Sequence, residues 1–284
     1  MSVPSVESGL ASSLRNSSLW SGLRHLKHSL IIRFAKRENR VYTRFNRFPN
    51  QFRALVEQVI PRIRPGNIGA QTAPLEIVVF ACCSGAEVFS LSWILQKHFP
   101  QLRFRIRGYD IVESVIQQAR AGVFKREEVF QGPYATEEFV AETFDLVEGE
   151  YRVKRSIADP TVFAVGSLLD KQLMDSLAGA DIVVAQNVLF HLPRPNARVA
   201  FGYLHDMLKP GGAMFVNGMD TDMRVAMTKR LKLEPLDFLV EEIHEDASID
   251  RGGGWAGAYW GRRPFSRSSR EWLRKYGTIY FRTS

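Results

Sequence analysis

The stretch 75–87, LEIVVFACCSGAE, carries most of the information about the fold class. Its apolar run, Leu75–Ala81, is typical of a buried β-strand, and the spacing of apolar residues over Ala86–His98 predicts a helix directly after the turn. Gly85 suits a tight turn in which the backbone approaches a ligand closely. The N-terminus of this helix would point at the end of the strand, where ligands bind in open α/β sheets.

Further apolar, β-rich runs follow, and they alternate with helical segments. Strands are expected at Phe104–Tyr109, Val162–Val165, Asp181–Ala185 and Ala213–Asn217, and helices at Glu113–Ala121, Asp170–Leu177 and Pro195–Leu208. Because parallel strands need crossover connections, this alternation predicts a parallel sheet with helices on both faces, the doubly wound α/β class. A helix over Tyr134–Phe144, a hairpin over Phe144–Val153 and a last strand over Tyr276–Arg282 complete the prediction.

The positive charge of the chain is concentrated near its start. The 284 residues carry a formal charge of +8, of which residues 1–70 hold +9 and residues 71–284 hold −1. The pattern predicts a basic amphipathic helix over Leu23–Arg40 and a second helix over Pro49–Ile63. The expected organisation is a disordered tail (1–22), a basic helical domain (23–64), a linker (65–74) and the α/β domain (75–284).

Composition and cysteine usage narrow the class of protein. With 45% hydrophobic and 24% charged residues, the chain is typical of globular proteins with a sizeable core. The two cysteines, Cys82 and Cys83, are adjacent, which disfavours a disulfide between them and indicates a reduced, cytoplasmic protein. No C-x-x-C pair is present and no metal site is expected, and the apolar run of about Ile77–Cys83 is far too short to span a membrane.

The end of the second predicted strand supplies a candidate binding residue. Asp110 follows Gly85 by 25 residues, at the place where an acid can accept hydrogen bonds from both hydroxyls of a ribose. Neither G-x-G-x-x-G nor G-x-x-x-x-G-K-[ST] occurs, which disfavours a dinucleotide or a nucleoside triphosphate.

Several segments, in the right order over about residues 40–218, resemble the CheR-type chemotaxis methyltransferases. The segment 43–55, TRFNRFPNQFRAL, is similar to that family's T-x-F-F-R…F-x-x-L, and 81–90, ACCSGAEVFS, to A-x-x-[ST]-G-x-E-x-[YF]-S. The segment 109–124 is similar to D-I-x…A-R-x-G-x-[YF]. Further along, 167–169 (SLL) stands at the family's N-L-L, 186–188 (QNV) at R-N-V, and 208–212 at L-K-P-G-G.

The resemblance implies a class I methyltransferase that converts S-adenosylmethionine to S-adenosylhomocysteine. It implies a Rossmann-like, mostly parallel sheet with an antiparallel last strand, preceded by a small helical domain. Asp110 suits the ribose, Glu87 the amino group of the cofactor or the orientation of loop amides, and Arg47 a carboxylate of the cofactor or of the acceptor. The family's cofactor positions, together with two residues of the glycine turn, are Thr43, Arg47, Cys83, Gly85, Glu87, Asp110, Ser167, Leu168, Gln186 and Asn187.

The acceptor decides whether a catalytic base is needed. A carboxylate, with a pKa near 4.3, is ionised at neutral pH and needs none, whereas an alcohol or an ammonium group does. Arg47 and His191 are the candidate catalytic residues: His191 follows Asn187 closely and would serve as a base for a less acidic acceptor, or would shape the cofactor pocket.

Departures from the family favour a different acceptor. Gln186 replaces the arginine of R-N, and residues 231–275, which we interpret as a lid or a substrate-specific insertion, include the unfamiliar stretch 251–265. There Trp255, Tyr259 and Trp260 lie between glycines and would stack on an acceptor from a mobile flap, or would pack the edge of the sheet.

We therefore expect methyl transfer to a small metabolite or to a non-receptor protein. The alternatives are a protein-glutamate O-methyltransferase that acts on a chemoreceptor and a non-catalytic, cofactor-binding docking module. An acidic protein surface is the expected partner of the N-terminal basic helix, and no nucleic acid is expected, because this helix lacks interleaved aromatic residues.

Overall fold

A computed structural model of the chain describes residues 43–66, 73–250 and 265–283. They belong to one compact unit, Tyr42–Ser284, so the helix predicted over Pro49–Ile63 lies in the same unit as the sheet. How the chain divides into domains around the 65–74 linker stays a prediction. The predicted tail, the basic helix over Leu23–Arg40 and the aromatic residues Trp255, Tyr259 and Trp260 lie outside the described residues.

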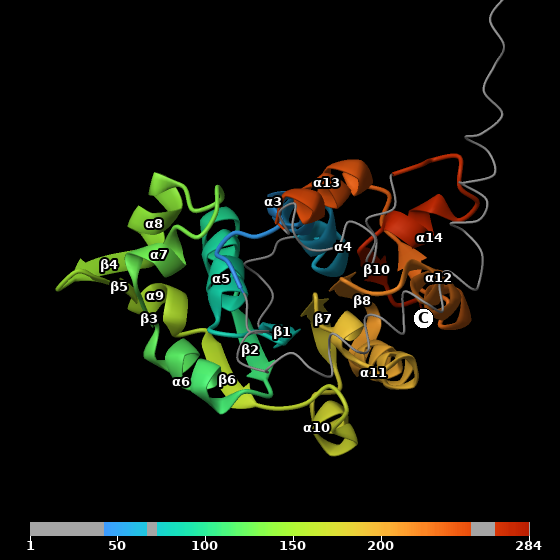
Figure 1. Cartoon of the computed structure of the whole chain (residues 1–284), viewed down its shortest axis with the longest axis horizontal. Helices are drawn as coiled ribbons and strands as arrows, with labels where there is room; N and C mark the ends of the chain where they lie inside the picture. Colours follow the sequence, from blue (N-terminus) through green and yellow to red (C-terminus); the bar gives the residue numbers. More distant parts are fainter. Residues whose placement is uncertain (1–42, 67–72, 251–264, 284) are drawn as a thin grey trace, which may run out of the picture. The chain divides into compact units, whose positions relative to one another are not determined.

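The main sheet of the described part has the strand order β6-β2-β1-β7-β8-β10-β9 (Figure 1). The strands from β6 to β8 in this order are parallel, β10 is antiparallel to β8, and β9 is antiparallel to β10. This confirms a mostly parallel α/β sheet with an antiparallel last strand. The strands are β1 (Leu75–Phe80), β2 (Phe104–Asp110), β6 (Thr161–Val165), β7 (Ala180–Gln186), β8 (Leu208–Asn217), β9 (Glu234–Pro235) and β10 (Ile279–Phe281).

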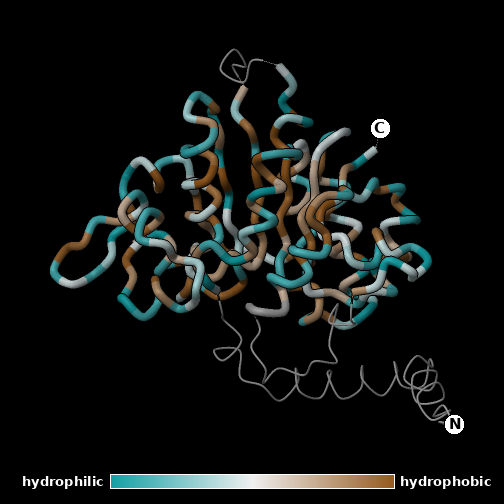
Figure 2. Tube along the Cα trace, turned by 90° about the horizontal axis from the view of Figure 1, so that it is seen from above, coloured by the Kyte–Doolittle hydropathy of each residue, from teal (hydrophilic) through white to brown (hydrophobic). Residues whose placement is uncertain are grey.

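Helices cover both faces of the sheet, because successive side chains of each strand point to opposite faces. Ile77 and Val79 of β1 enter one core, and Val78 and Phe80 enter the other. The first core receives residues from α3 (Pro49–Ala54), η2 (Leu55–Val59), α4 (Ile60–Ile63), α5 (Ala86–His98), α6 (Glu113–Ala121) and α13 (Val240–Asp250). The second receives residues from α10 (Lys171–Ser176), α11 (Arg194–Met207) and α12 (Thr221–Arg230). Figure 2 shows hydrophobic strands at the centre and more hydrophilic segments outside.

Helix α5 and helix α6 have the predicted bounds, and the other predicted strands and helices of the α/β pattern appear with small shifts. The helix predicted over Pro49–Ile63 contains the π-helical segment η2. Pro61 has no N–H to donate to the carbonyl of Glu57, and its ring would clash with that carbonyl, which accounts for the wider turn just before it. The last predicted strand begins too early, because Tyr276 ends α14 (Trp272–Tyr276). Helices α12 and α13 were not predicted.

A second, antiparallel sheet extends from one side of the molecule (Figure 1). Its order is β3-β5-β4, with β3 at Val123–Phe124, β4 at Phe144–Val147 and β5 at Glu150–Val153. The hairpin predicted over 144–153 is therefore confirmed. The ring of Phe45 lies 5.0 Å from that of Phe124 and 5.2 Å from that of Phe144, so the segment before α3 packs against this sheet. Helices α7 (Arg126–Val129), α8 (Glu137–Thr143) and α9 (Arg155–Ala158) flank it.

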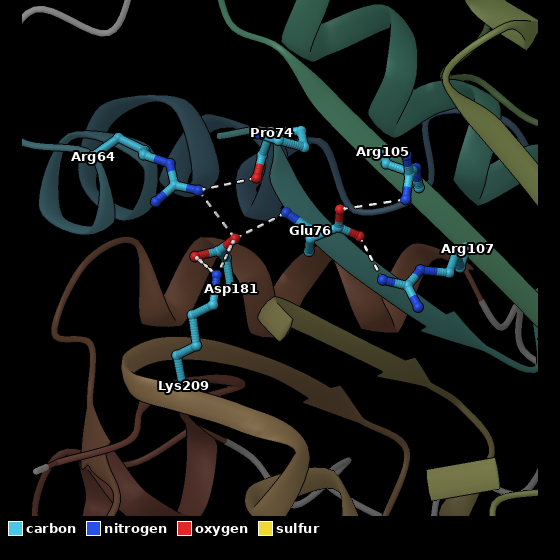
Figure 3. Close-up of polar contacts among 7 residues, drawn as sticks. All are labelled: Arg64, Pro74, Glu76, Arg105, Arg107, Asp181 and Lys209. Carbon is cyan, nitrogen blue, oxygen red and sulfur yellow. Dashed lines mark hydrogen bonds and ion pairs between the residues drawn. The ribbon is translucent and has the colours of Figure 1, made fainter. Parts of the chain in front are cut away.

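Charged side chains connect the amino ends of the main strands (Figure 3). The Asp181 carboxylate, 5% exposed, accepts hydrogen bonds from Arg64 Nη2 at 3.1 Å, from Lys209 Nζ at 3.2 Å and from the backbone N–H of Glu76 at 2.8 Å. Glu76 in turn pairs with Arg107. We call this cluster the amino-end network; its members are Arg64, Glu76, Arg105, Arg107, Asp181 and Lys209.

Helix α13 is attached to the start of α3 by one buried carboxylate. Asp246 accepts hydrogen bonds from the backbone N–H of Asn50 at 2.9 Å and from its side-chain Nδ2 at 3.1 Å. Burial raises the pKa of Asp246, while these two donors oppose the rise. None of the helices in the described ranges is both long and apolar enough to cross a membrane.

Candidate functional site

The candidate site lies at the carboxyl ends of the parallel strands, where the strand order reverses between β1 and β7. From β1 the chain proceeds to β2 and β6 on one side, and from β7 to β8 on the other. The loops after adjacent strands diverge at such a point and leave a crevice, which is where open α/β sheets bind ligands. The predicted residues after β1, β2, β6 and β7 all stand at this end of the sheet.

The turn after β1 has an unusual backbone. Ala81 has φ 54°, Cys83 has φ 51° and Gly85 has φ 87°. Left-handed conformations are costly for residues other than glycine, and they persist only where the surroundings hold them. A Cβ atom on Gly85 would stand 3.0 Å from the rings of Phe163 and Phe89. The turn is therefore closely packed underneath and leads directly into the N-terminus of α5.

Asp110 joins the loops after β1 and β2. Its Oδ2 accepts a hydrogen bond from the N–H of Cys83 at 3.0 Å, and its Oδ1 accepts one from the N–H of Val112 at 3.0 Å. Its backbone carbonyl accepts from the N–H of Gly166 at 2.9 Å, which brings the loop after β6, with Ser167, beside it. The carboxylate is 9% exposed and fixed in orientation, with lone pairs left for a ligand.

Apolar side chains lie exposed near Asp110. Ile111 is 56% exposed and Leu169 is 37% exposed, whereas Leu168 is buried in the second core. Exposed apolar surface beside a fixed carboxylate suits a ligand that has both a flat apolar part and a hydroxylated part. The sequence analysis proposed Leu168 and missed Ile111 and Leu169. Ile111 could have been predicted from the sequence. It directly follows Asp110 at the end of a strand, where an apolar side chain lies beyond the core of the sheet.

The segment before α3 brings Arg47 to this end of the sheet. Arg47 is 7% exposed, and its guanidinium lies 4.9 Å from the centre of the Phe48 ring. Its positive charge opposes the rise in the pKa of Cys83, so Arg47 lies near the turn after β1. Thr43, at the start of the described segment, is half-buried. Arg47 and the turn are thus parts of one site although they are far apart in the sequence.

Glu87 supplies a second buried carboxylate, in the first turn of α5. It is 8% exposed, and a negative charge there is favoured by the partial positive charge of the helix N-terminus. Its charge also contributes to the raised pKa of Cys82. Glu87 and Asp110 therefore place two carboxylates around the turn after β1.

The two cysteines of the turn are not nucleophiles. Burial raises the pKa of Cys82 well above its ordinary value, and the charge of Asp110 raises it further. Burial likewise raises the pKa of Cys83 to about 11. Since the thiolate is the reactive form of cysteine, both side chains are neutral thiols near neutral pH. Cys83 contributes its backbone N–H, through the bond to Asp110, rather than its sulfur.

Gln186, at the end of β7, is held by a chain of buried amides. Its Nε2 donates to Oε1 of Gln51 at 2.6 Å, and Nε2 of Gln51 donates to Oγ1 of Thr278 at 2.7 Å. Asn217 is the partner of Gln186 on β8. Within the described residues, Gln186 Oε1 and Asn217 Nδ2 are buried without a hydrogen-bond partner. Sequence reasoning missed Gln51 and Asn217, although Asn217 ends an otherwise apolar strand.

The loop after β7 is fixed to the end of β8. Asn187 has φ 51°, and its N–H donates to the carbonyl of Asn217 at 3.0 Å. His191 ends the short helix η4 (Leu189–His191), and its ring lies 3.9 Å from the ring of Phe190. The proposed aromatic residues of the flap lie outside the described residues. Among the residues that the structure describes, no group of three or more His, Cys, Asp and Glu side chains is arranged to hold a metal ion.

These residues fit the expected cofactor. Asp110 presents a fixed carboxylate for two hydroxyls, Ile111 and Leu169 present an apolar surface for a base, and Glu87 presents an anion for an amino group. Arg47 supplies a cation for a carboxylate. The arrangement offers a binding site for a zwitterionic nucleoside, with no activated nucleophile among the residues described around the turn.

Comparison with known proteins shows the family of the chain. The family model of the CheR methyltransferase SAM-binding domain matches residues 41–236. The chain is 26% identical over 219 residues to chemotaxis protein methyltransferase 2 of Vibrio cholerae, covering 75% of this chain and 73% of that protein. It is 29% identical over 204 residues to the probable biofilm formation methyltransferase WspC of Pseudomonas aeruginosa, covering 72% of this chain.

A further relative is chemotaxis protein methyltransferase 1 of Pseudomonas aeruginosa, 29% identical over 176 residues, with 60% of this chain and 62% of that protein covered. The match to WspC spans only 47% of the length of that protein.

Proposed function

This chain belongs to the CheR methyltransferase family and is an S-adenosylmethionine-dependent methyltransferase, and from that premise we propose that it methylates a side-chain carboxylate of a protein. The observation that carries the choice of a protein acceptor is the second sheet, in which β4 is an edge strand among the described residues and exposes apolar side chains.

The cofactor is held at the carboxyl ends of β1, β2 and β6. Asp110 binds the ribose hydroxyls, Glu87 the amino group and Arg47 a carboxylate, while Ile111 and Leu169 contact the adenine. Gly85 adopts the left-handed backbone of the turn, and a Cβ there would meet the core rings of Phe163 and Phe89. Thr43, Cys83, Ser167, Leu168, Gln186 and Asn187 complete the proposed cofactor surroundings.

Methyl transfer asks little covalent chemistry of this chain. When bound, the cofactor supplies an electrophilic methyl group on a sulfonium. A carboxylate acceptor is ionised at neutral pH and needs no base, so the chain's contribution is to align the acceptor and exclude water. Among the two interpretations of His191, this acceptor favours the one in which the imidazole shapes the pocket. Its close contact with the Phe190 ring supports that role.

The free edge of β4 supports docking of an extended peptide. Strand β4 pairs with β5 alone in the described part, and it exposes Leu146 by 65% and Val147 by 39%. An edge strand offers unpaired backbone N–H and C=O groups, and exposed apolar side chains beside them give a partner strand something to cover. The neighbouring ring of Phe130, 37% exposed, stacks under the guanidinium of Arg126 at 4.8 Å and extends this surface.

Gln186 supports an acceptor other than the membrane chemoreceptor on which the family acts. Where the family has an arginine, this chain has a neutral amide whose Nε2 is already bonded to Gln51. The end of β7 therefore offers no cation to the acceptor. Such a change at the end of β7 alters which acceptor fits, while Arg47, Glu87 and Asp110 keep the residue types of the family's motifs.

The test is to incubate the protein with methyl-labelled S-adenosylmethionine and an extract of the source cells, and then to separate proteins from small molecules. We expect label in protein, released as methanol by mild alkali, because carboxyl methyl esters hydrolyse under those conditions. Label confined to small molecules would overturn the protein acceptor. Alkali-stable label in protein would overturn the carboxylate.

A matched pair of variants tests the docking edge. Leu146→Lys places a charge on β4, whereas Val199→Lys places the same charge at an exposed apolar position of α11, 45% exposed. We expect the first to reduce labelling of protein by about tenfold, with cofactor affinity unchanged, because one buried apolar contact of an interface is worth roughly 1–2 kcal/mol. Equal labelling by the two variants would contradict docking on β4.

A further inference from the structure

We infer that the Ser90 hydroxyl is a positioning group that holds Arg47 in the cofactor site. The inference rests on the proposed role of Arg47. Ser90 lies in α5 and is fully buried. Its Oγ donates to the carbonyl of Ala86 at 2.7 Å and accepts from the backbone N–H of Asn46 at 2.9 Å. One hydroxyl thus connects the first turn of α5, next to Glu87, with the residue before Arg47.

The segment around Arg47 needs such a support. Asn46 has φ 50° and Phe48 has φ 63°, so left-handed residues flank Arg47 on both sides. Residues other than glycine keep this conformation only where their surroundings favour it over the ordinary one. The Phe48 side is fixed, because its ring is 1% exposed and its carbonyl accepts from the N–H of Gln51 at 2.9 Å. On the Asn46 side, the bond to Ser90 fixes the backbone.

Loss of the Ser90 hydroxyl would therefore leave a buried N–H without an acceptor. Asn46 is 7% exposed, so water does not easily replace the lost partner. The backbone is relieved by rotating Asn46 away from φ 50°, and this rotation moves the neighbouring Arg47. Arg47 and the turn after β1 lie on different segments of the chain. Their distance therefore depends on tertiary contacts such as the bond between Asn46 and Ser90, and local chain geometry would not correct a shift of Arg47.

The same helix offers a matched control. Ser92 is also fully buried, and its Oγ donates to the carbonyl of Ile157 in α9 at 2.7 Å. Ser92→Ala removes a buried hydroxyl of the same kind, from the same helix, without touching the segment of Arg47. A general loss of packing or helix stability would affect both variants alike.

The experiment measures the Kd of S-adenosylmethionine by calorimetry, and Tm, for the wild type, Ser90→Ala and Ser92→Ala. We expect similar decreases in Tm for the two variants. We expect the Kd to rise about tenfold in Ser90→Ala alone, the affinity change that corresponds to one unsatisfied buried donor. A Kd in Ser90→Ala equal to that in Ser92→Ala would overturn the inference.

A double-mutant cycle shows whether Ser90 acts through Arg47. In the Arg47→Ala background, Ser90→Ala should leave the Kd unchanged, because the side chain that it positions is absent. An additive tenfold loss in that background would mean that Ser90 acts by another route, and the inference would fail. Failure of the wild type to bind the cofactor would instead contradict the proposed function, so the two failures are distinguishable.

Discussion

The two ends of the main sheet differ in the groups that they bring together: ion pairs at the amino ends, and left-handed turns with amide side chains at the carboxyl ends. At the amino ends, the carboxylate of Asp181 accepts hydrogen bonds from Arg64, from Lys209 and from the backbone of Glu76. Within the described residues, Nε of Arg64 and Nε of Arg107 in the same network are buried without a hydrogen-bond partner. At the carboxyl ends, buried polar atoms of Gln186 and Asn217 have no partner among the described residues. Left-handed backbone conformations occur at Asn46, Phe48, Ala81, Cys83 and Asn187, all around the crevice.

The difference indicates where the chain has been shaped for stability and where for binding. At the amino ends, ion pairs connect neighbouring strands, Arg107 with Glu76 and Lys209 with Asp181. At the carboxyl ends, we expect the left-handed residues and the unpaired amide atoms of Gln186 and Asn217 to serve the binding of a ligand or an acceptor. The most direct way to test this division is to change one group at each end and to measure both affinity and stability.

The largest effect is expected from Asp110→Ala at the carboxyl end. The variant should bind S-adenosylmethionine about a thousandfold more weakly, since two hydrogen bonds to a charged group, at roughly 2 kcal/mol each, are lost. Calorimetric titration measures the change, and Asp206→Ala, which removes an exposed acid of α11, is the control with unaltered affinity. Undiminished binding in Asp110→Ala would show that the ribose lies elsewhere.

At the amino end, Asp181→Ala should lower the stability of the protein and leave its affinity for the cofactor unchanged. Removing this carboxylate leaves the guanidinium of Arg64 partly buried without its acid, and we expect the free energy of unfolding to fall by about 3 kcal/mol. The Kd for the cofactor should not change. Urea unfolding and calorimetry on the same variant provide the two measurements. A lower affinity in Asp181→Ala would mean that the two ends of the sheet are coupled, which would contradict a role of Asp181 in stability alone.

A pair of glycines, one at each end of the sheet, tests the same comparison with smaller expected effects. Gly85→Ala and Gly212→Ala each introduce a Cβ close to its neighbours, at 3.0 Å from the Phe163 ring and at 2.9 Å from the carbonyl oxygen of Asp181, respectively. Both should lower stability, Gly85→Ala by about 1–2 kcal/mol from its left-handed backbone alone. The Kd should rise in Gly85→Ala and stay unchanged in Gly212→Ala. Parallel changes in affinity would contradict a specific role for the turn.

The smallest effect concerns the pH dependence of stability. The pKa of Asp246 is raised on folding, so the folded state binds this proton more tightly than the unfolded state. Its contribution to stability is therefore greatest in acid and decreases as the pH rises above the ordinary aspartate pKa of 3.8. The free energy of unfolding of the wild type, minus that of Asp246→Asn, should decline from pH 4 to pH 7. A difference that increases over this range would show that the two donors of Asn50 outweigh burial.

Much of the fold was predictable because its signals are local. The helices at Ala86–His98 and Glu113–Ala121 have the expected bounds, since a glycine turn and a strand-end acid mark where they begin. Helix α12 has no such pattern, because Arg224 is 2% exposed and donates to the carbonyls of Lys275 and Gly277. An arginine that is buried and donates through Nη1 to distant backbone looks like a surface residue in the sequence.

The candidate site divides in the same way. Gly85 and Asp110 could be proposed because Gly85 lies in the turn after β1 and Asp110 ends β2, where the fold class itself indicates a ligand. The pairing of Gln51 with Gln186 joins residues 135 positions apart, and no motif or spacing announces it. The bond from Asn46 to Ser90 is likewise a tertiary contact, which appears only once α5 and the segment before α3 are packed together.

The buried cysteines give the turn after β1 an experimental use. Cys82 and Cys83 are the only thiols of the chain, and both are buried with raised pKa values. A thiol reagent therefore modifies only molecules in which this turn has opened, and the rate of alkylation counts the openings. A ligand that binds the closed turn slows this rate in proportion to its occupancy. The alkylation rate of Cys82 and Cys83 in the unmodified protein therefore measures how often the turn after β1 opens.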